Sequence, residues 1–131
     1  MTAPSEPPQT PPSPGPQPGL EAIPIFAELS PAERSALRRE FETLVLKRGD
    51  VLMHQGDPAD ALYLVVSGRF AVTITGRSQP ITEIGPDQPI GEIAFLAGGT
   101  RSATVTAMRD SLVLRLGREQ FDRLSAKNPG I

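Results

Sequence analysis

The first regular pattern of apolar residues along the chain has the period of a helix. Residues 30–33 read Ser-Pro-Ala-Glu, which is typical of a helix start because the serine can cap free backbone N–H groups and the glutamate completes a capping box. Leu37, Phe41 and Leu44 follow at spacings of four and three residues, so they would lie on one helical face. This pattern predicts an amphipathic helix over about residues 31–43.

After residue 49 the pattern changes to short apolar runs separated by Gly, Asp and Pro, which is typical of strands joined by turns. Ser67-Gly68 separates two such runs and predicts a two-residue hairpin turn. Phe121 and Leu124, after Gly117, predict a second helix. The expected strands cover residues 51–54, 61–66, 69–74, 81–84, 102–108 and 111–116. Many short strands at close spacing predict a small barrel or jelly roll with helices at its ends.

Proline content divides the chain into two parts. The first 19 residues hold 8 of the 15 prolines and contain no aromatic or large aliphatic residue apart from Met1. Such a segment cannot bury enough apolar surface to offset the entropy lost on ordering. We therefore expect residues 1–19 to form a disordered Pro-rich tail, and residues 20–131 to form one domain.

Charge and residue counts exclude several classes of function. The chain carries 13 basic and 15 acidic residues, so it lacks the basic surface that contact with nucleic acid requires. It has no cysteine, and its single histidine, His54, cannot form a metal site alone. No run approaches the ~20 apolar residues of a membrane span, and the N-terminus does not resemble a signal peptide. We expect a cytoplasmic module without catalytic residues, metal ligands or a cofactor.

The connection between the strands that end at Ile84 and begin at Ser102 is too long and too rich in glycine for a hairpin turn. Long connections inside a compact domain are often functional. Residues 91–96 can form one or two helical turns, whose first N–H groups attract an anion. Gly91, at the start of these turns, allows the backbone to approach a ligand closely.

Two charged side chains in this connection are candidates for ligand binding. Arg101 offers a planar set of donors that suits two phosphate oxygens. Glu92 lies nine residues earlier and can accept a hydrogen bond from a ligand hydroxyl such as a ribose 2′-OH. One arginine matches the single negative charge of a cyclic monophosphate. The alternative is that Glu92 and Arg101 pair with each other, or with neighbours, to hold the loop.

Several segments match a known family. Residues 90–96 read Ile-Gly-Glu-Ile-Ala-Phe-Leu, and residues 100–105 read Thr-Arg-Ser-Ala-Thr-Val. The upstream residues that also match are Gly49, Asp50, Gln55, Gly56, Asp57, Asp60, Tyr63 and Gly68. With these motifs, the chain from about Ile23 to Ile131 resembles the cyclic-nucleotide-binding domain family. This family includes bacterial catabolite activator proteins, regulatory subunits of cAMP-dependent kinase and cyclic-nucleotide-gated channels.

The resemblance implies a fold and a set of ligand contacts. The fold would be mainly β with flanking helices: an eight-stranded antiparallel β-roll, or jelly-roll-like double-stranded β-helix, with an N-terminal helix and a short C-terminal helix. The ligand would be cAMP or cGMP, whose ribose 2′-hydroxyl would bind Glu92 and whose cyclic phosphate would bind Arg101. Backbone groups would shape the rest of the pocket at Gly91, Ile93, Ala94 and Ser102. The signal would pass to an effector domain or partner protein.

The sequence departs from the family pattern at three places. Thr100 stands where proline is common, which would loosen the loop, and Ile90 stands where an aromatic residue is common. The chain reaches Ile131 about where the family's long C-terminal lid helix begins, so we expect a domain without that lid. Two other hypotheses stay open: an interaction module that ignores nucleotides, and the N-terminal regulatory part of a larger enzyme such as a patatin-like phospholipase.

Overall fold

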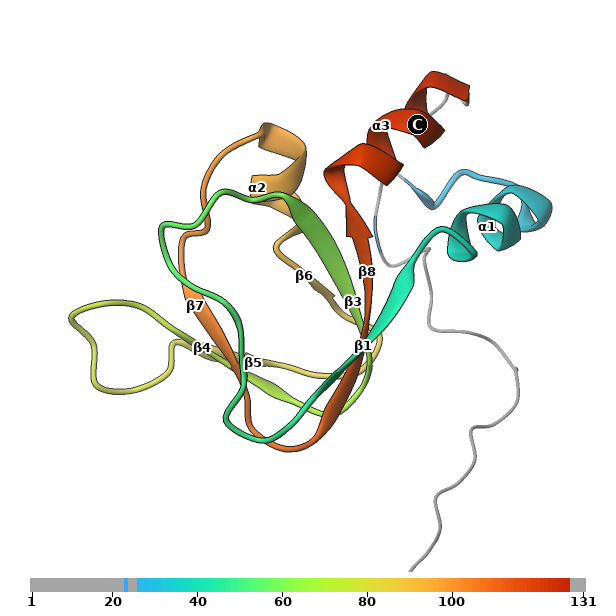
Figure 1. The fold of residues 1–131 in the computed structure, drawn as a ribbon. Coiled ribbons are helices and arrows are strands. Elements are labelled where there is room, and N and C mark those ends of the chain that lie inside the picture. Colours follow the sequence, from blue (N-terminus) through green and yellow to red (C-terminus); the bar gives the residue numbers. More distant parts are fainter. Residues whose placement is uncertain (1–22, 24–25, 128–131) are drawn as a thin grey trace, which may run out of the picture.

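Two antiparallel four-stranded sheets face each other and form a β-roll (Figure 1). The computed structural model describes Ile23 and residues 26–127. Within them the helices are α1 (Pro31–Arg38), α2 (Glu92–Ala97) and α3 (Arg118–Lys127). The strands described are β1 (Glu42–Leu46), β2 (Val51–Met53), β3 (Ala61–Ser67), β4 (Phe70–Thr73), β5 (Thr82–Ile84), β6 (Pro89–Ile90), β7 (Thr104–Ala107) and β8 (Ser111–Gly117). One sheet has the order β1-β8-β3-β6, and the other has the order β2-β7-β4-β5.

The predicted fold class is confirmed. All six strands expected from the apolar pattern are present, and their ends differ from the prediction by at most two residues. The strands that the apolar pattern does not predict are β1 and β6, which complete the eight implied by the family resemblance. The expected Pro-rich tail, residues 1–19, lies outside the described residues.

Helix α1 begins as predicted but is shorter than predicted. Ser30 and Glu33 form the capping box: the Ser30 hydroxyl accepts from the Glu33 N–H at 3.1 Å, and Glu33 accepts from the Ser30 N–H at 2.8 Å. The helix ends at Arg38, and Leu44 belongs to β1 rather than to the helical stripe. The prediction to residue 43 was wrong because residues 43–46, Thr-Leu-Val-Leu, also suit a strand, and pairing with β8 decides between the two.

The sheet that contains β3 is covered on both faces. Alternate residues of β3 point in opposite directions, so Tyr63 lies inside the roll and Leu62 lies on the outer face. The inner core also contains Phe70 and Val113. The outer face packs against α1, α3 and the segment before α1, through buried residues such as Phe26 and Leu37. The β2-β7-β4-β5 sheet contributes to the inner core alone.

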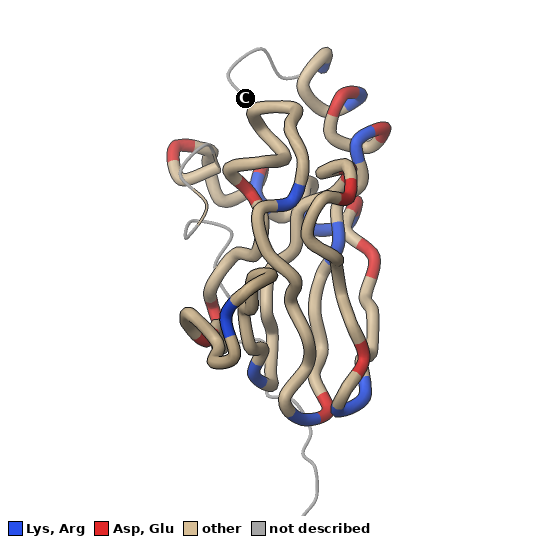
Figure 2. Tube along the Cα trace, turned by 90° about the vertical axis from the view of Figure 1, so that its left-hand side faces the viewer, with Lys and Arg blue, Asp and Glu red and all other residues tan. Residues whose placement is uncertain are grey.

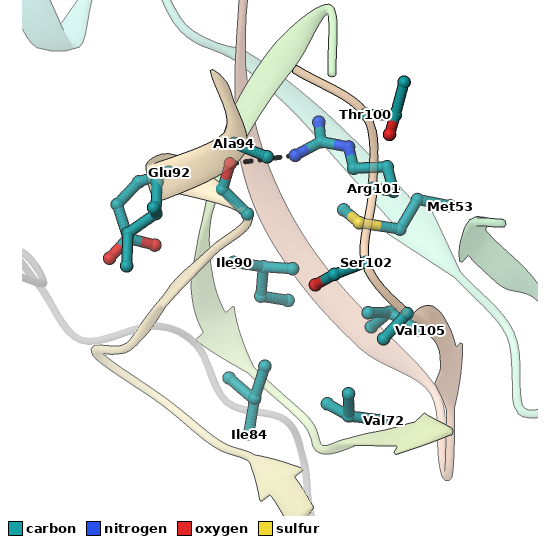
Figure 3. A pocket seen from close by; sticks show the side chains of 13 residues that line it. Met53, Val72, Ile84, Ile90, Glu92, Ala94, Thr100, Arg101, Ser102 and Val105 are labelled. Carbon is teal, nitrogen blue, oxygen red and sulfur yellow. Dashed lines mark hydrogen bonds between the residues drawn. The ribbon is translucent and has the colours of Figure 1, made fainter. Parts of the chain in front are cut away.

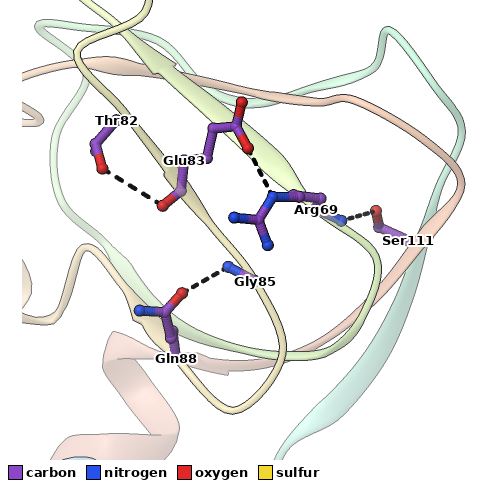
Figure 4. Close-up of polar contacts among 6 residues, drawn as sticks. All are labelled: Arg69, Thr82, Glu83, Gly85, Gln88 and Ser111. Atoms are coloured by element: carbon purple, nitrogen blue, oxygen red, sulfur yellow. Dashed lines mark hydrogen bonds and ion pairs between the residues drawn. The ribbon is translucent and has the colours of Figure 1, made fainter.

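The Ser67-Gly68 turn joins the two sheets instead of closing a hairpin. β3 and β4 belong to different sheets and do not pair, so the hairpin prediction was wrong. Gly68 has φ +102°, and a Cβ at this position would come within 1.9 Å of the Ser111 hydroxyl oxygen. This close approach lets the Ser111 Oγ accept a hydrogen bond from the Arg69 N–H at 3.2 Å (Figure 4). The chain therefore passes from one sheet to the other at Gly68, next to Ser111, the first residue of β8.

Two further polar contacts stabilise the part of the roll near the Ser67-Gly68 turn (Figure 4). The Arg69 Nε donates to Glu83 Oε1 at 2.6 Å and forms an ion pair between β4 and β5. Gln88 accepts from the Gly85 N–H at 2.6 Å and closes the turn between β5 and β6. Helix α2 lies at the opposite end of the roll from the turn between β3 and β4 (Figure 1).

Charged residues of both signs are interleaved along the chain trace (Figure 2). At the lower end of that view, basic and acidic positions lie next to each other. Within the described part of the chain, no helix is long and apolar enough to cross a membrane, and no group of three or more His, Cys, Asp or Glu residues is placed to hold a metal ion.

Gly68→Ala should destabilise the domain strongly, because the new methyl group meets Ser111 and the backbone has a left-handed φ. Gly76→Ala is the matched control: its φ is +92°, and nothing lies within 4 Å of the added Cβ. We expect a loss of about 1 kcal/mol for Gly76→Ala and about 3 kcal/mol for Gly68→Ala in urea unfolding. Equal losses would show that Ser111 does not restrict this turn.

Candidate functional site

A pocket of about 400 Å³ lies at the α2 end of the roll (Figure 3). This volume falls within the range of about 300–1,000 Å³ that is usual for small-molecule sites. One wall is apolar and continues the inner core through Met53, Val72, Ile84, Ile90 and Val105. The structure brings all six predicted ligand contacts to this pocket: Gly91, Glu92, Ile93, Ala94, Arg101 and Ser102.

Arg101 is held by both its backbone and its side chain. The guanidinium Nη1 donates to the Gly91 carbonyl at 2.8 Å, and Nη2 donates to the Ala61 carbonyl. The Arg101 N–H donates to the Asp57 carbonyl at 2.8 Å, and its own carbonyl accepts from the Gly56 N–H at 2.8 Å. These bonds join the loop before β7 to α2, to β3 and to the β2–β3 loop.

The charge on Arg101 is buried in the pocket wall. The residue is 4% exposed. Burial lowers the pKa of Arg101, while Tyr63, Asp60 and Asp57 act in the opposite direction. Arginine nevertheless remains protonated in proteins, because its ordinary pKa is so high. Two of its five N–H donors bind carbonyls, which leaves donors for an anion in the pocket.

Gly91 has a conformation and surroundings that require glycine. It precedes α2 with φ +73°, in the left-handed region. A Cβ at this position would lie 2.1 Å from Nη1 of Arg101. The absence of a side chain therefore lets the Arg101 guanidinium reach the Gly91 carbonyl.

The short helix predicted at residues 92–96 is present as α2 and forms one rim of the pocket. The N–H groups of Glu92, Ile93 and Ala94 lie in its first turn and have no acceptor within the helix. Ile93 is 77% exposed, so its contribution to the pocket comes from the rim. Phe95 is fully buried and stacks edge-on against Phe121 of α3, with 5.2 Å between ring centroids.

Glu92 and Arg101 do not pair. No ion pair or hydrogen bond joins them within the described residues, and the Glu92 carboxylate points away from the guanidinium (Figure 3). The alternative in which they neutralise each other is therefore wrong, although Arg101 does tie the loop through backbone carbonyls. Ser102 directs its hydroxyl toward the pocket (Figure 3).

Thr100 does not leave its loop loose, contrary to the expectation from the missing proline. It forms a β-bridge with Pro58. On either side of this bridge, Ala59 donates to Gly99 at 3.0 Å and Arg101 donates to Asp57. Backbone pairing with the β2–β3 loop thus holds the loop at Thr100, where proline is common in the family.

The sequence alone did not identify the residues of the apolar pocket wall or the carboxylates near Arg101. The wall residues follow from strand alternation once the two sheets are known, because inward positions of β4 and β7 face the same space. Asp57 and Asp60 belong to the matched upstream motif, but that motif alone does not place them beside Arg101.

A double-mutant cycle on Glu92→Gln and Arg101→Lys should give a coupling free energy below about 0.5 kcal/mol, because the two side chains make no contact. Glu92→Gln alone should change the free energy of unfolding by no more than about 0.5 kcal/mol. Chemical denaturation of the four proteins without ligand measures both values. A coupling above about 1 kcal/mol would restore the ion-pair hypothesis.

The chain is similar in sequence to a known domain family and to parts of longer known proteins. The cyclic nucleotide-binding domain family matches residues 43–128. A cAMP-dependent protein kinase regulatory subunit from Hypocrea atroviridis is 38% identical over 112 residues, covering 86% of this chain and 24% of that protein. Lysophospholipase nte1 from Aspergillus oryzae is 37% identical over 93 residues, covering 69% of this chain and 6% of that protein.

A solved structure shares the fold. The crystal structure of the N-terminal domain of a transcriptional regulator from Streptomyces coelicolor A3(2) superimposes with a TM-score of 0.75 at 35% identity, covering 81% of this chain and 78% of that chain. The chain spans about a quarter or less of the length of the two curated relatives. By its sequence match, its β-roll and the position of α2, the chain belongs to the cyclic nucleotide-binding domain family.

Proposed function

We propose that this chain binds a cyclic mononucleotide, cAMP or cGMP, in the pocket beside α2. The observation that carries the proposal is Arg101: a buried residue, 4% exposed, whose guanidinium lies in the wall of an apolar pocket and has more N–H donors than the two that bind Gly91 and Ala61. A buried charge of this kind is costly unless an anion or hydrogen-bond partners compensate it. A cyclic phosphate supplies one negative charge and two free oxygens.

The phosphate binds between Arg101 and the first turn of α2. The guanidinium donates to the phosphate oxygens as a charge-assisted pair, which is stronger and more directional than a neutral hydrogen bond. The N–H groups of Glu92, Ile93 and Ala94 add donors on the other side. The hydroxyl of Ser102 adds one further donor from the strand side.

The ribose and the base bind next to the phosphate. The Glu92 carboxylate has no hydrogen bond or ion pair with another described residue and lines the pocket, so it can accept from the ribose 2′-OH. This bond contributes about 1.5–3 kcal/mol. The base lies against the apolar wall formed by residues such as Val72 and Ile84. Together these contacts are sufficient for micromolar affinity, about −8 kcal/mol.

Binding of the cyclic nucleotide regulates an effector by changing the conformation of the domain. A ligand shifts a conformational equilibrium only by its different affinity for the two states, so the part that changes must touch the site. α2 carries site residues and contacts α3 through Phe95 and Phe121, which makes these helices the moving part. The effector is a partner protein or a further domain, and the domain itself performs no chemistry.

A second candidate is the regulatory part of a larger enzyme. The match to lysophospholipase nte1 favours it, because that match covers 6% of the relative's length and therefore a small part of a much longer protein. In this case the domain still binds the nucleotide, and the effector is a lipid hydrolase. A hydrolase assay on the full-length protein, with and without cyclic nucleotide, separates this candidate from a non-enzymatic sensor.

Thermal unfolding with 1 mM cAMP, cGMP or 5′-AMP should reveal the ligand. A ligand that binds the native state alone with a Kd of about 100 μM adds about 1.4 kcal/mol at this concentration. The midpoint should therefore rise by several degrees with a cyclic nucleotide and not with 5′-AMP. Arg101→Lys should abolish the shift, and 2′-deoxy-cAMP should give a smaller one. No shift with any cyclic nucleotide would favour the interaction module that ignores nucleotides.

Gly91→Ala should weaken cyclic-nucleotide binding by about tenfold or more, because the added Cβ displaces the Arg101 guanidinium that holds the phosphate. Gly98→Ala is the matched control at the other end of α2, since its φ is +75° and nothing lies within 4 Å of the added Cβ. Both variants carry similar backbone strain, but Gly91→Ala should lose more unfolding free energy because its Cβ also displaces a buried, hydrogen-bonded guanidinium. Isothermal titration gives the affinities, and an equal loss in both variants would contradict the role of Gly91.

A further inference from the structure

The carboxyl end of α2 lacks a basic residue of its own. Its last turn contains no Lys, Arg or His, although a helix end of this kind carries partial negative charge and free carbonyls. Gly98, with φ +75°, ends the helix and donates its N–H to the Phe95 carbonyl at 3.2 Å. Another positive group near the Phe95 carbonyl would stabilise this end further.

Arg118, the first residue of α3, supplies that group from a different part of the chain. Its Nη2 donates to the Phe95 carbonyl, and the same atom lies 3.4 Å from the Ala59 carbonyl. The guanidinium carbon sits 4.0 Å from the centroid of the Phe95 ring, within the range of a cation–π contact. One side chain therefore binds the backbone of α2, stacks on a side chain of α2 and reaches the β2–β3 loop.

The backbone of Arg118 is fixed as well. Its N–H donates to the Asp60 carbonyl at 2.9 Å, and it directly follows strand β8. Strand β8 lies between β1 and β3 in a sheet that is buried on both faces. Arg118 therefore extends from the end of a central strand toward the short helix α2 and the β2–β3 loop.

Those two segments are the ones that hold Arg101. The β2–β3 loop accepts the Arg101 N–H at Asp57 and donates to its carbonyl from Gly56. Helix α2 begins next to Gly91, whose carbonyl accepts from the Arg101 guanidinium. Arg118 thus binds α2 at Phe95 and the loop at Ala59 and Asp60. Arg101 binds Gly91 before α2 and the same loop at Gly56 and Asp57.

We propose that Arg118 is a positioning residue for the nucleotide site, which it serves by clamping α2 to the β2–β3 loop. Lysine would keep the charge and one bond to the Phe95 carbonyl, but it has no planar group to stack on the ring and reach Ala59 at the same time. Arg118 acts through α2 and the loop and does not itself touch the ligand. The effect on affinity rests on the proposed function, whereas the effect on α2 does not.

The test compares Arg118→Gln and Arg118→Lys with the control Arg115→Gln. Arg115 lies three residues earlier and has Glu42, at 4.0 Å, as its ionic partner in the described part of the chain. The first readout is amide hydrogen exchange of residues 91–99 without ligand. Arg118→Gln should increase this exchange about tenfold or more relative to β8, Arg118→Lys should increase it less, and Arg115→Gln should leave it unchanged.

The second readout is the affinity for cAMP and cGMP by titration, together with urea unfolding. Arg118→Gln should weaken binding by about tenfold or more, and Arg118→Lys should recover part of the loss. Unchanged exchange of residues 91–99 in Arg118→Gln would overturn the proposal, even if the wild-type protein bound no cyclic nucleotide. Increased exchange with unchanged affinity would overturn the link to the site. If Arg118→Gln does not fold, Arg118→Lys decides through the same two readouts.

Discussion

The buried guanidinium of Arg101 is the interaction on which the arrangement of the pocket depends. It donates to the carbonyls of Gly91, before α2, and Ala61, in β3, and its backbone is paired with the β2–β3 loop, so one residue cross-links three neighbouring segments. The same group carries the positive charge of the pocket. The structural role and the proposed ligand-binding role therefore depend on the same side chain, and both require that Gly91 carries no side chain.

The roll explains why the pocket lies where it does. Inward positions of both sheets form one apolar core, and this core continues to the end covered by α2, where it becomes the pocket wall. At the other end, polar contacts and tight turns close the roll, as in the pair of Arg69 with Glu83. The outer face of the β1-β8-β3-β6 sheet packs against α1 and α3, so α3 can be in contact with α2 while its base stays fixed to a strand.

Much of this could be predicted from the sequence, for physical reasons that differ between elements. The capping box around Ser30 depends on neighbouring residues and was predicted correctly, as was the short helix after Gly91. The end of α1 depends on pairing with β8, about seventy residues away, and the turn at Gly68 depends on a contact with Ser111. The six candidate site residues share one pocket because they lie in a single connection, whereas the apolar wall and the position of Arg118 required the tertiary structure.

Every residue that lines the pocket comes from one stretch of the chain, between Met53 and Val105. The pocket lining is therefore encoded in one continuous segment, although the supporting fold, including β8 and Arg118, extends beyond it. The matched relatives include a kinase regulatory subunit, a lysophospholipase and a transcriptional regulator, so the same segment occurs in proteins of different kinds.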